Sequence, residues 1–329
     1  MFAAVLCTGP AAAQLVPNLG GQRAGISAFQ FLKIGVGARG VAMGEAYVAV
    51  ANDASSLFWN PAGMAQMTDN EVFVAHTEYV ADIRHEYLGG VYHLTGADVI
   101  GVSATSLHMK DMEITTETQP LGTGRYFTFG DVGLGVSYAR KMTDQFSFGA
   151  SVRYVEETLD ILKMRSFMVD LGTYYWTGLG TTRFAVVITN FGADVKPSGT
   201  AVMTDGGVIT DFQPFSLPTL FKLGFAFEPV MTDEHRVTVS VQLNHPNDNA
   251  ENVRLGTEYA WNNTLFLRGG LKRTIGQKLL AADETSEESY KLGAGFRVAT
   301  PVSTIEADYA YAHFGLLGAI HRFSVTFTL

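Results

Sequence analysis

Residues 145–158 read QFSFGASVRYVEET, and the alternation in this stretch decides the fold class. Apolar side chains alternate with small or polar ones: Phe146, Phe148, Ala150, Val152 and Tyr154 against Ser147, Gly149, Ser151 and Arg153. Successive side chains of a β-strand point to opposite faces, so one face of this segment is apolar and the other is polar. The sequence therefore predicts a strand that lies between an apolar and a polar environment.

Segments with the same alternation recur from residue 71 onward. We expect fourteen strands, at 71–79, 84–94, 98–107, 128–140, 145–158, 163–176, 181–191, 218–228, 234–244, 252–261, 264–272, 288–298, 303–311 and 320–329. An even number of segments of about ten residues is typical of transmembrane β-barrels, whose tilted strands cross about 25 Å of hydrocarbon.

The links between these segments differ in length in a regular way. Short links follow the even-numbered segments, at 95–97, 141–144, 177–180, 229–233, 262–263 and 299–302. Longer links follow most odd-numbered segments, notably at 107–127, 191–217 and 273–287, whereas the link after the first segment, 80–83, is short. Outer-membrane barrels have short periplasmic turns and longer external loops, so this alternation independently favours a barrel.

The composition excludes several other classes of protein. Hydrophobic residues make up 47% and charged residues 17% of the 329 residues, which argues against a disordered chain or a coiled coil. No run reaches the roughly 18 apolar residues that a spanning helix needs. The net charge of -9 argues against a nucleic-acid partner, because nucleic-acid binding favours a basic patch.

A large soluble β-sandwich is the main alternative, because its strands also alternate. Small residues on the polar faces are more typical of strands that curve around a filled lumen. Aromatic residues also end several apolar faces beside short links, where a girdle would meet the inner membrane interface: Tyr138, Tyr175, Phe227 and Trp261. We therefore predict an all-β protein, a 14-stranded antiparallel transmembrane β-barrel over residues 71–329 that is integral to the bacterial outer membrane and contacts its lipid.

The last predicted strand has a strongly apolar face. Phe323, Phe327 and Leu329 lie on that face. The outer-membrane insertion machinery recognises an apolar, aromatic-rich final strand, which offers an unpaired edge before insertion. We interpret these three residues as the membrane insertion signal, with a buried terminal strand as the alternative.

Residues 1–13 have features of a secretory signal. Residues 2–6 are a short apolar run, and Ala11, Ala12 and Ala13 fit the small-residue pattern that signal peptidase requires. A basic n-region is absent from this stretch, so we interpret it as the remnant of a signal peptide. The only cysteine, Cys7, lies within it, and a lipoprotein site there is the alternative.

Residues 14–70 differ from the rest of the chain. Gly35, Gly37 and Gly44 are interspersed with small apolar residues, and the pattern indicates short helices joined by glycine. Such helices cannot form a domain alone, whereas the polar lumen of a fourteen-stranded barrel is wide enough to need a plug. We predict that this segment is a hatch that fills the lumen.

Two helix starts are expected within the hatch. Asp53 is a suitable N-cap for a helix over 54–58. Asn60 followed by Pro61 is an N-cap with proline at the first helical position, so a second helical turn should begin at Pro61.

One block of the hatch carries a family resemblance: residues 31–67 read FLKIGVGARGVAMGEAYVAVANDASSLFWNPAGMAQM. This block, which includes Asp53, resembles the N-terminal hatch of the FadL-like outer-membrane barrels. The Asn-Pro-Ala motif of that hatch matches Asn60, Pro61 and Ala62, which Gly63 follows. The stretches LKIGVGARG, MGEAYVAVANDAS and FWNPAGMA are most similar to the PorV/PorQ branch that is associated with type IX secretion.

The resemblance implies two alternative functions, neither of which requires catalysis. PorV-like proteins are partners that dock beside a secretion pore, receive exported cargo proteins by their C-terminal domains and deliver them for surface attachment. FadL-like proteins instead carry hydrophobic small molecules, such as fatty acids or aromatics, passively through the hatch and a lateral opening. We favour the first function, because the long links at 107–127 and 191–217 could form a docking surface.

Charged residues also fall on the face that we expect to line the lumen. The arginines are Arg153, Arg236, Arg254, Arg268, Arg297 and Arg322, and the other charges are Asp170, Lys222, Glu258, Lys291, Glu306 and Asp308. We interpret them as groups that hydrate the interior or hydrogen-bond to backbone groups of the hatch. A basic cluster that holds an anionic head group is the alternative, and pairs of opposite charge would serve neither role.

The sequence has no motif that indicates catalysis. The patterns G-x-S-x-G and H-E-x-x-H and the phosphate loop are absent. The eight histidines show no metal-ligand spacing. Asp283, Glu284, Glu287 and Glu288 are expected in an external loop, where a solvated loop tip is favoured over a divalent-cation site. We therefore expect no catalytic residues, no cofactor and no metal site.

Overall fold

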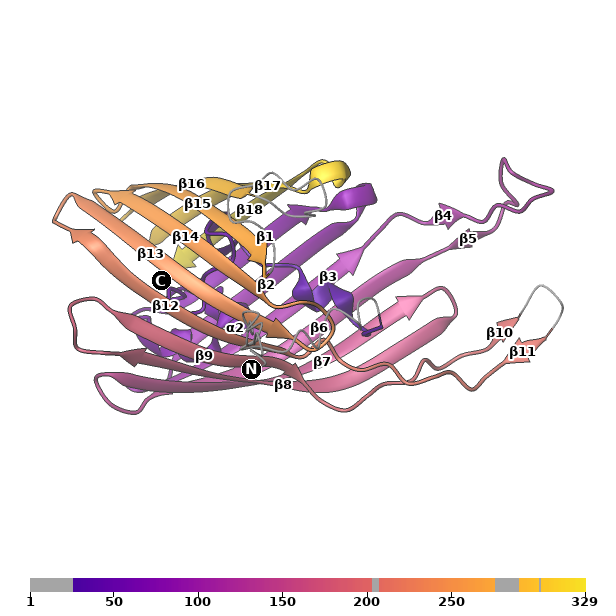
Figure 1. Cartoon of the computed structure of the whole chain (residues 1–329), viewed down its shortest axis with the longest axis horizontal. Coiled ribbons are helices and arrows are strands. Elements are labelled where there is room, and N and C mark those ends of the chain that lie inside the picture. Colours follow the sequence, from indigo (N-terminus) through magenta and orange to yellow (C-terminus); the bar gives the residue numbers. More distant parts are fainter. Residues whose placement is uncertain (1–25, 203–206, 276–289, 302) are drawn as a thin grey trace, which may run out of the picture.

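Fourteen antiparallel strands close into one barrel in the computed structural model, which describes residues 26–202, 207–275, 290–301 and 303–329. The strands are β1 Glu71–Glu78, β2 Arg84–His93, β3 Asp98–His108, β6 Phe129–Lys141, β7 Phe146–Leu159, β8 Leu162–Trp176, β9 Arg183–Phe191, β12 Leu220–Met231, β13 His235–Pro246, β14 Asn252–Trp261, β15 Leu265–Thr274, β16 Tyr290–Ala299, β17 Thr304–His313 and β18 Ala319–Thr328. Each pairs with its neighbours along the chain, and β1 closes the ring against β18 (Figure 1). The predicted fold class is confirmed.

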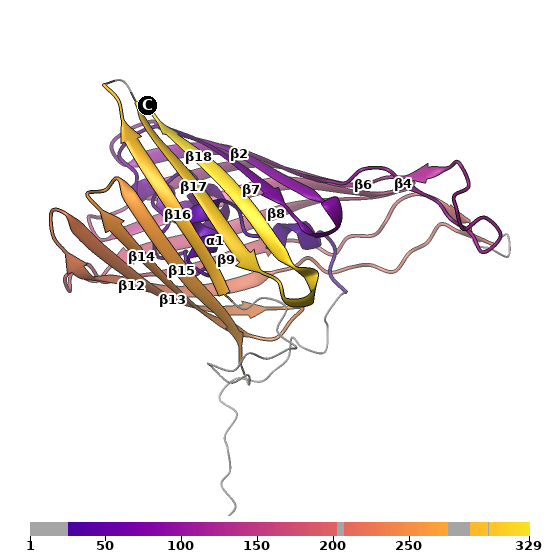
Figure 2. The same ribbon diagram turned by 90° about the horizontal axis from the view of Figure 1, so that it is seen from above.

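Two small sheets lie outside this ring, at the end of the barrel where the long links emerge. One pairs β4, Met112–Glu113, with β5, Tyr126–Phe127. The other pairs β10, Ala201–Val202, with β11, Val208–Ile209. Both extend well beyond the barrel wall (Figures 1 and 2). Sequence alternation did not predict them, because two-residue strands carry no measurable period.

The exposure of the strand residues follows the predicted alternation. In β7, Val152 is 53% exposed, whereas its neighbours Ser151 and Arg153 are 3% and 8% exposed. The apolar face of the barrel therefore points outward and the polar face points into the lumen. Among the residues predicted to form the inner girdle, Tyr138 and Trp261 are exposed on the outer surface. Tyr175 and Phe227 are partly exposed there.

The apolar face of β18 also points outward. Phe323, Phe327 and Leu329 are all exposed. In the closed barrel β18 is paired on both edges, with β1 and with β17. The three residues proposed as an insertion signal therefore contribute to the lipid-facing surface of the folded protein.

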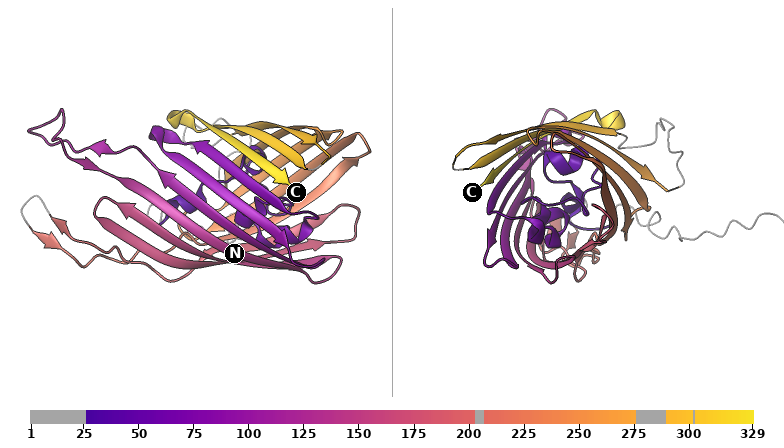
Figure 3. Two further views of the ribbon diagram at one scale, coloured as in Figure 1. Left: turned by 180° about the vertical axis from the view of Figure 1, so that it is seen from behind. Right: turned by 90° about the vertical axis from the view of Figure 1, so that its left-hand side faces the viewer.

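Residues 26–70, which we call the hatch, lie inside the ring (Figure 3). The hatch contains the short helices η2 Gln30–Lys33, α1 Ala38–Ala42, α2 Ser56–Trp59 and η3 Pro61–Gln66. Nearly every side chain from 36 to 51 is buried, so the lumen is filled along most of this segment. Among the described residues, no helix is both long enough and apolar enough to cross a membrane. Residues 1–13, interpreted as a signal remnant, and residues 14–25 of the predicted hatch lie outside the described residues.

One of the two predicted helix starts is wrong. α2 begins at Ser56, two residues later than expected, and Ser55 occupies the N-cap position. Asp53 instead folds its carboxylate back onto the backbone N–H of Ser55, at 3.0 Å, and onto the Ser55 hydroxyl. This local turn competes with the helix for the same backbone groups. The second prediction is confirmed: η3 begins at Pro61, and Asn60 caps it by accepting from Ala62 N–H at 3.1 Å.

The placement of the apolar face in lipid can be tested at Val241, near the middle of β13. Its side chain is 38% exposed on the outer surface. Changing Val241→Arg should lower the free energy of unfolding from lipid vesicles by about 2 to 4 kcal/mol, because a guanidinium near the bilayer midplane loses its hydration. Val208→Arg, in the sheet outside the barrel, should leave that free energy unchanged. Equal costs for the two variants would place Val241 outside the bilayer.

Candidate functional site

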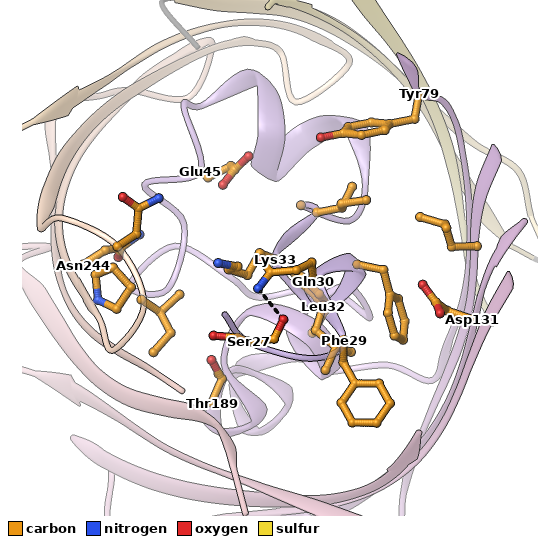
Figure 4. Close-up of a pocket in the computed structure, with 18 of the residues that line it drawn as sticks. Ser27, Phe29, Gln30, Leu32, Lys33, Glu45, Tyr79, Asp131, Thr189 and Asn244 are labelled. Carbon is orange, nitrogen blue, oxygen red and sulfur yellow. Dashed lines mark hydrogen bonds between the residues drawn. The ribbon is translucent and has the colours of Figure 1, made fainter. Parts of the chain in front are cut away.

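A cavity lies at the end of the barrel that carries the long links, and we call it the outer cavity. Its volume is about 560 Å³, within the range of small-molecule sites. Strand ends surround it: Leu107 lies near the end of β3, Phe129 begins β6, and Leu220 begins β12. Figure 4 shows hatch residues Gln30 and Lys33 crossing its centre. A second pocket, lined partly by Gln66 and Trp176, lies at the opposite end.

The two sides of the outer cavity differ in polarity. Phe29, Phe31, Ile83, Leu107 and Phe129 make one side mainly apolar, and the carboxylates on that side belong to Asp131 and Glu157. Asn244, Asn252, Thr189, Lys222 and Arg254 make the other side polar. In Figure 4, Asp131 and Asn244 lie on opposite walls. The cavity can therefore accommodate a molecule that has both apolar and polar parts.

Residues 27–35 of the hatch line the cavity as a strap, and Asp248 holds this strap in place. One carboxylate oxygen, Oδ2, accepts from Ser27 Oγ at 2.6 Å, from Lys33 Nζ at 2.7 Å and from Gln30 Nε2 at 3.2 Å. Burial alone would raise the pKa of Asp248, but the Lys33 ammonium and the Ser27 hydroxyl outweigh it and hold the pKa below its usual range. The strap is thus latched to the link between β13 and β14.

The Asn-Pro-Ala motif anchors the hatch to the wall on the β7–β8 side. Asn60 is fully buried, and its Nδ2 donates to Val48 O at 2.9 Å and to Thr173 O of β8 at 3.1 Å. Its Oδ1 accepts from Ala62 N–H. Both amide hydrogens and the amide oxygen are therefore used, and the side chain ties two parts of the hatch to a strand of the barrel.

Glycines on the inner wall make room for this motif. A Cβ added to Gly149 would overlap Pro61 and Ala62 backbone atoms, and one added to Gly172 would overlap the Asn60 side chain. Small residues on the polar face were expected from wall curvature. The structure gives a second reason, since the hatch backbone touches the wall at these positions.

The hatch glycines have separate local roles. Gly37 and Gly44 have φ values of 77° and 65°, in the left-handed region that glycine adopts at little cost. Gly44 also packs against the backbone of β15 beside Gly270. Gly35 has no such φ value, and a Cβ there would meet Val41 and Glu45. Gly63 packs against Ala51 and Ser56 within the hatch.

A network of ion pairs joins the hatch to the opposite side of the barrel. Arg39 of α1 donates to Glu258 of β14 through Nε at 2.9 Å and Nη2 at 3.0 Å. Glu258 also accepts from Arg268 Nε of β15 at 2.7 Å. Arg39 Nη1 reaches Asp53 within the hatch at 2.8 Å. Glu258 and Arg268 are buried, so both charges depend on these partners.

Glu45 makes a second connection between hatch and wall. Its carboxylate pairs with Arg254 of β14 and with Lys291 of β16, the latter at 2.6 Å. All three side chains are buried. Arg183 of β9 adds a third connection, donating from Nε to the hatch carbonyl of Ala49 at 2.8 Å.

All six arginines predicted to face the lumen do so, but their partners differ from those expected. Arg153, Arg254, Arg268 and Arg322 are buried, and Arg236 and Arg297 are partly buried. Arg153 pairs with Asp170, Arg268 with Glu258, Glu306 and Asp308, and Arg297 with Glu306. Pairs of opposite charge thus dominate, in place of hydration or of bonds to hatch backbone.

The sequence interpretation missed Arg39 and Glu45. They are the only charged residues between 34 and 52, in a stretch of small apolar side chains, and that isolation was a usable signal. Among the described residues, no group of three or more His, Cys, Asp or Glu side chains is arranged to hold a metal ion. The acidic residues at 283, 284, 287 and 288 lie outside the described residues.

Comparison with a known family agrees with this architecture. The family described as type IX secretion system protein PorV matches residues 19–247, which is more than half of the 329 residues. The chain belongs to the PorV family. No protein with a curated description matches this PorV-family chain in sequence.

Solved structures share the fold of this PorV-family protein. The CymD monoaromatic hydrocarbon channel is 15% identical, with a TM-score of 0.59 over 90% of this chain and 97% of CymD. A FadL homologue of Pseudomonas aeruginosa is 14% identical, with a TM-score of 0.54 over 88% and 97% of the two chains. The toluene transporter TodX of Pseudomonas putida is 14% identical, with a TM-score of 0.57 over 86% and 96%. The PorV-family protein is an integral outer-membrane β-barrel, and its fold is similar to that of FadL-like barrels.

The close contact between hatch and wall can be tested at Gly149. Gly149→Ala should lower the free energy of unfolding by about 1 to 3 kcal/mol, because backbone atoms of Pro61 and Ala62 cannot yield to the added methyl group. The measurement is urea-dependent unfolding in detergent. Gly90→Ala is the matched control, since the nearest atom to its added Cβ is Val102 Cγ2 at 3.9 Å. If the hatch did not touch β7, the two variants would have the same free energy of unfolding.

The latch at Asp248 predicts that the strap resists proteolysis while this carboxylate is charged. Because the pKa of Asp248 is lowered in the folded protein, the latch contributes stability above the ordinary aspartate pKa of about 3.9 and loses it as the pH falls further. Trypsin cleavage after Lys33 should therefore be slow at pH 7 and faster at pH 7 in Asp248→Asn. Asp211→Asn, which alters an exposed ion pair with Lys196, is the control. Unchanged cleavage in Asp248→Asn would show that the strap is held by other contacts.

Proposed function

We propose that this protein is a non-catalytic partner in type IX protein secretion and surface attachment. In this role it docks beside a secretion-pore protein and receives exported cargo proteins by their C-terminal domains. Membership of the PorV family supports the proposal, since the family is described by its place in that secretion system.

The observation that carries the proposal is the pair of small sheets outside the barrel. Met112 and Tyr126 of the β4–β5 sheet are 52% and 59% exposed, and Leu121, in the turn between the two strands, is 98% exposed. Val208 of β11 is 63% exposed in the second sheet. Apolar side chains that project into water beyond the membrane are typical of protein contact sites.

The filled lumen agrees with a docking role. The hatch is tied to the wall through Asn60, Arg39 and Glu45 and occupies the space between the two ends of the barrel. A protein that binds its partners by its outer end needs no open passage through the barrel.

The docking role can be tested in cells with a variant of the β4–β5 link. Met112→Asp with Leu121→Asp should reduce co-purification of the secretion-pore protein at least about tenfold, because two apolar contacts are replaced by charges. Export of surface proteins should fall in parallel. The control is Thr115→Asp, which adds a charge to the same exposed link without removing an apolar side chain. Heat-modifiable gel mobility reports that each barrel is folded.

Two results would contradict the docking role. One is full export of surface proteins from a strain that lacks this protein. The other is recovery of neither a pore protein nor a cargo protein when the intact barrel is purified under mild conditions.

A second candidate function is passive uptake of hydrophobic small molecules, and the apolar side of the outer cavity favours it. Phe29, Phe31 and Phe129 line that side at the end of the barrel that faces outward. Uptake should appear as influx of a fluorescent fatty acid into vesicles that contain the protein, faster than into protein-free vesicles. Equal rates would remove this candidate and leave the docking role unaffected.

A further inference from the structure

Two buried ionisable side chains of the outer cavity make no hydrogen bond or ion pair with another described residue. Asp131 of β6 is 2% exposed and Lys222 of β12 is 5% exposed. Both line the cavity, and three strands, β7, β8 and β9, separate their strands around the ring. A buried charge without a partner is unfavourable, so each group is fully charged only when a counter-charge lies beside it, and a ligand can supply that counter-charge.

Asp131 lies at an acidic position of the wall. Its Oδ1 is buried and makes no hydrogen bond. Glu157 of β7 is directly opposite Asp131 in the strand register, and its Oε2 accepts from Phe29 N–H at 2.8 Å. Like charges directly opposite each other on neighbouring strands are unfavourable. In Figure 4 the Asp131 carboxylate points into the cavity, where a positively charged group of a ligand would relieve both costs.

Lys222 lies at a basic position of the same cavity. Its Nζ is 5.8 Å from the ring centroids of Phe58 and Trp59 and makes no ion pair with a described residue. The neighbouring carboxylates are already used, because Glu45 pairs with Arg254 and Lys291, and Asp170 pairs with Arg153. A negatively charged group of a ligand would complete this position.

We propose that the outer cavity binds a small zwitterionic molecule with an apolar body, of the class of short peptides. Its ammonium group lies at Asp131 and Glu157, and its carboxylate lies at Lys222. The body contacts the apolar side of the cavity at Phe29, Phe31 and Phe129. The volume of about 560 Å³ suits a ligand of this size. This site is additional to the docking role and does not depend on it.

The unmodified protein allows a first test by calorimetry in detergent. The probe is the tripeptide trileucine, with N-acetyl-trileucine, trileucine amide and decanoate as comparisons. Trileucine should bind at least about tenfold more tightly than the forms that lack one charge, because each of those forms loses one charge-assisted hydrogen bond. Decanoate carries a carboxylate and an apolar body but no ammonium group.

Two variants assign the charges to their ends. Asp131→Asn should weaken trileucine and trileucine amide at least about tenfold and leave N-acetyl-trileucine unchanged. Lys222→Met should weaken the binding of trileucine and N-acetyl-trileucine and leave the binding of trileucine amide unchanged. Asp160→Asn and Lys110→Met are the matched controls, since both residues are exposed and lie outside the cavity. The charge-conserving variant Lys222→Arg should retain binding.

Several outcomes would overturn the proposal. Absence of trileucine binding to the unmodified, folded barrel would do so without any variant. Binding of decanoate in preference to trileucine would identify a fatty-acid site instead. Unchanged binding of the amide to Asp131→Asn would mean that Asp131 carries a proton and needs no cation.

Discussion

The polar lumen inside an apolar wall is the constraint on which the rest of this structure depends. Alternating strands that turn one face to lipid must turn the other inward, and here that inner face carries buried arginine and carboxylate groups. These charges require partners of opposite sign, because water is largely excluded by the hatch. Glu258 illustrates the solution, since one carboxylate is shared by Arg268 of the wall and Arg39 of the hatch. Hatch and barrel thereby satisfy each other's charges.

Close packing between the hatch and the wall fixes the position of the hatch more strictly than the ion pairs do. Ion pairs could tolerate small shifts of the hatch, but the contact of Pro61 and Ala62 with Gly149 cannot, because backbone meets backbone there. Asn60 then fixes the register, with hydrogen bonds to Val48 of the hatch and Thr173 of the wall. Charge pairing holds the hatch on the β14–β16 side, where Gly44 also packs against Gly270, and close packing with the Asn60 hydrogen bonds holds it on the β7–β8 side. The two ends of the barrel are therefore separated by a segment that is tied to the wall on both sides.

The parts of the structure that the sequence predicted are those governed by local periodicity. Alternation and link length gave the fourteen strands and the direction in which Arg153 and Val152 point. Asn60 and Pro61 gave the start of η3 because capping is a local interaction. The partners of Arg39 and Glu45 depend on the register of β14, β15 and β16 around the hatch, which no local pattern encodes. The start of α2 was wrong although capping is local, because the Asp53 carboxylate forms a turn with Ser55, and Arg39, from elsewhere in the hatch, holds its other oxygen.

The way the hatch is held also bears on which function the fold supports. Passage of a molecule through the barrel would require the hatch to move, and removing one partner of a buried ion pair costs about 3 to 5 kcal/mol. Movement of α1 would break the contacts of Arg39 with Glu258 and with Asp53. If the segment after α1 moved with it, Glu45 would also lose Arg254 and Lys291. Docking at the outer sheets and binding in the outer cavity need none of these contacts to break. Activities at the outer end of the barrel are therefore compatible with the structure as it stands, whereas transport requires a second state with its own set of charge partners.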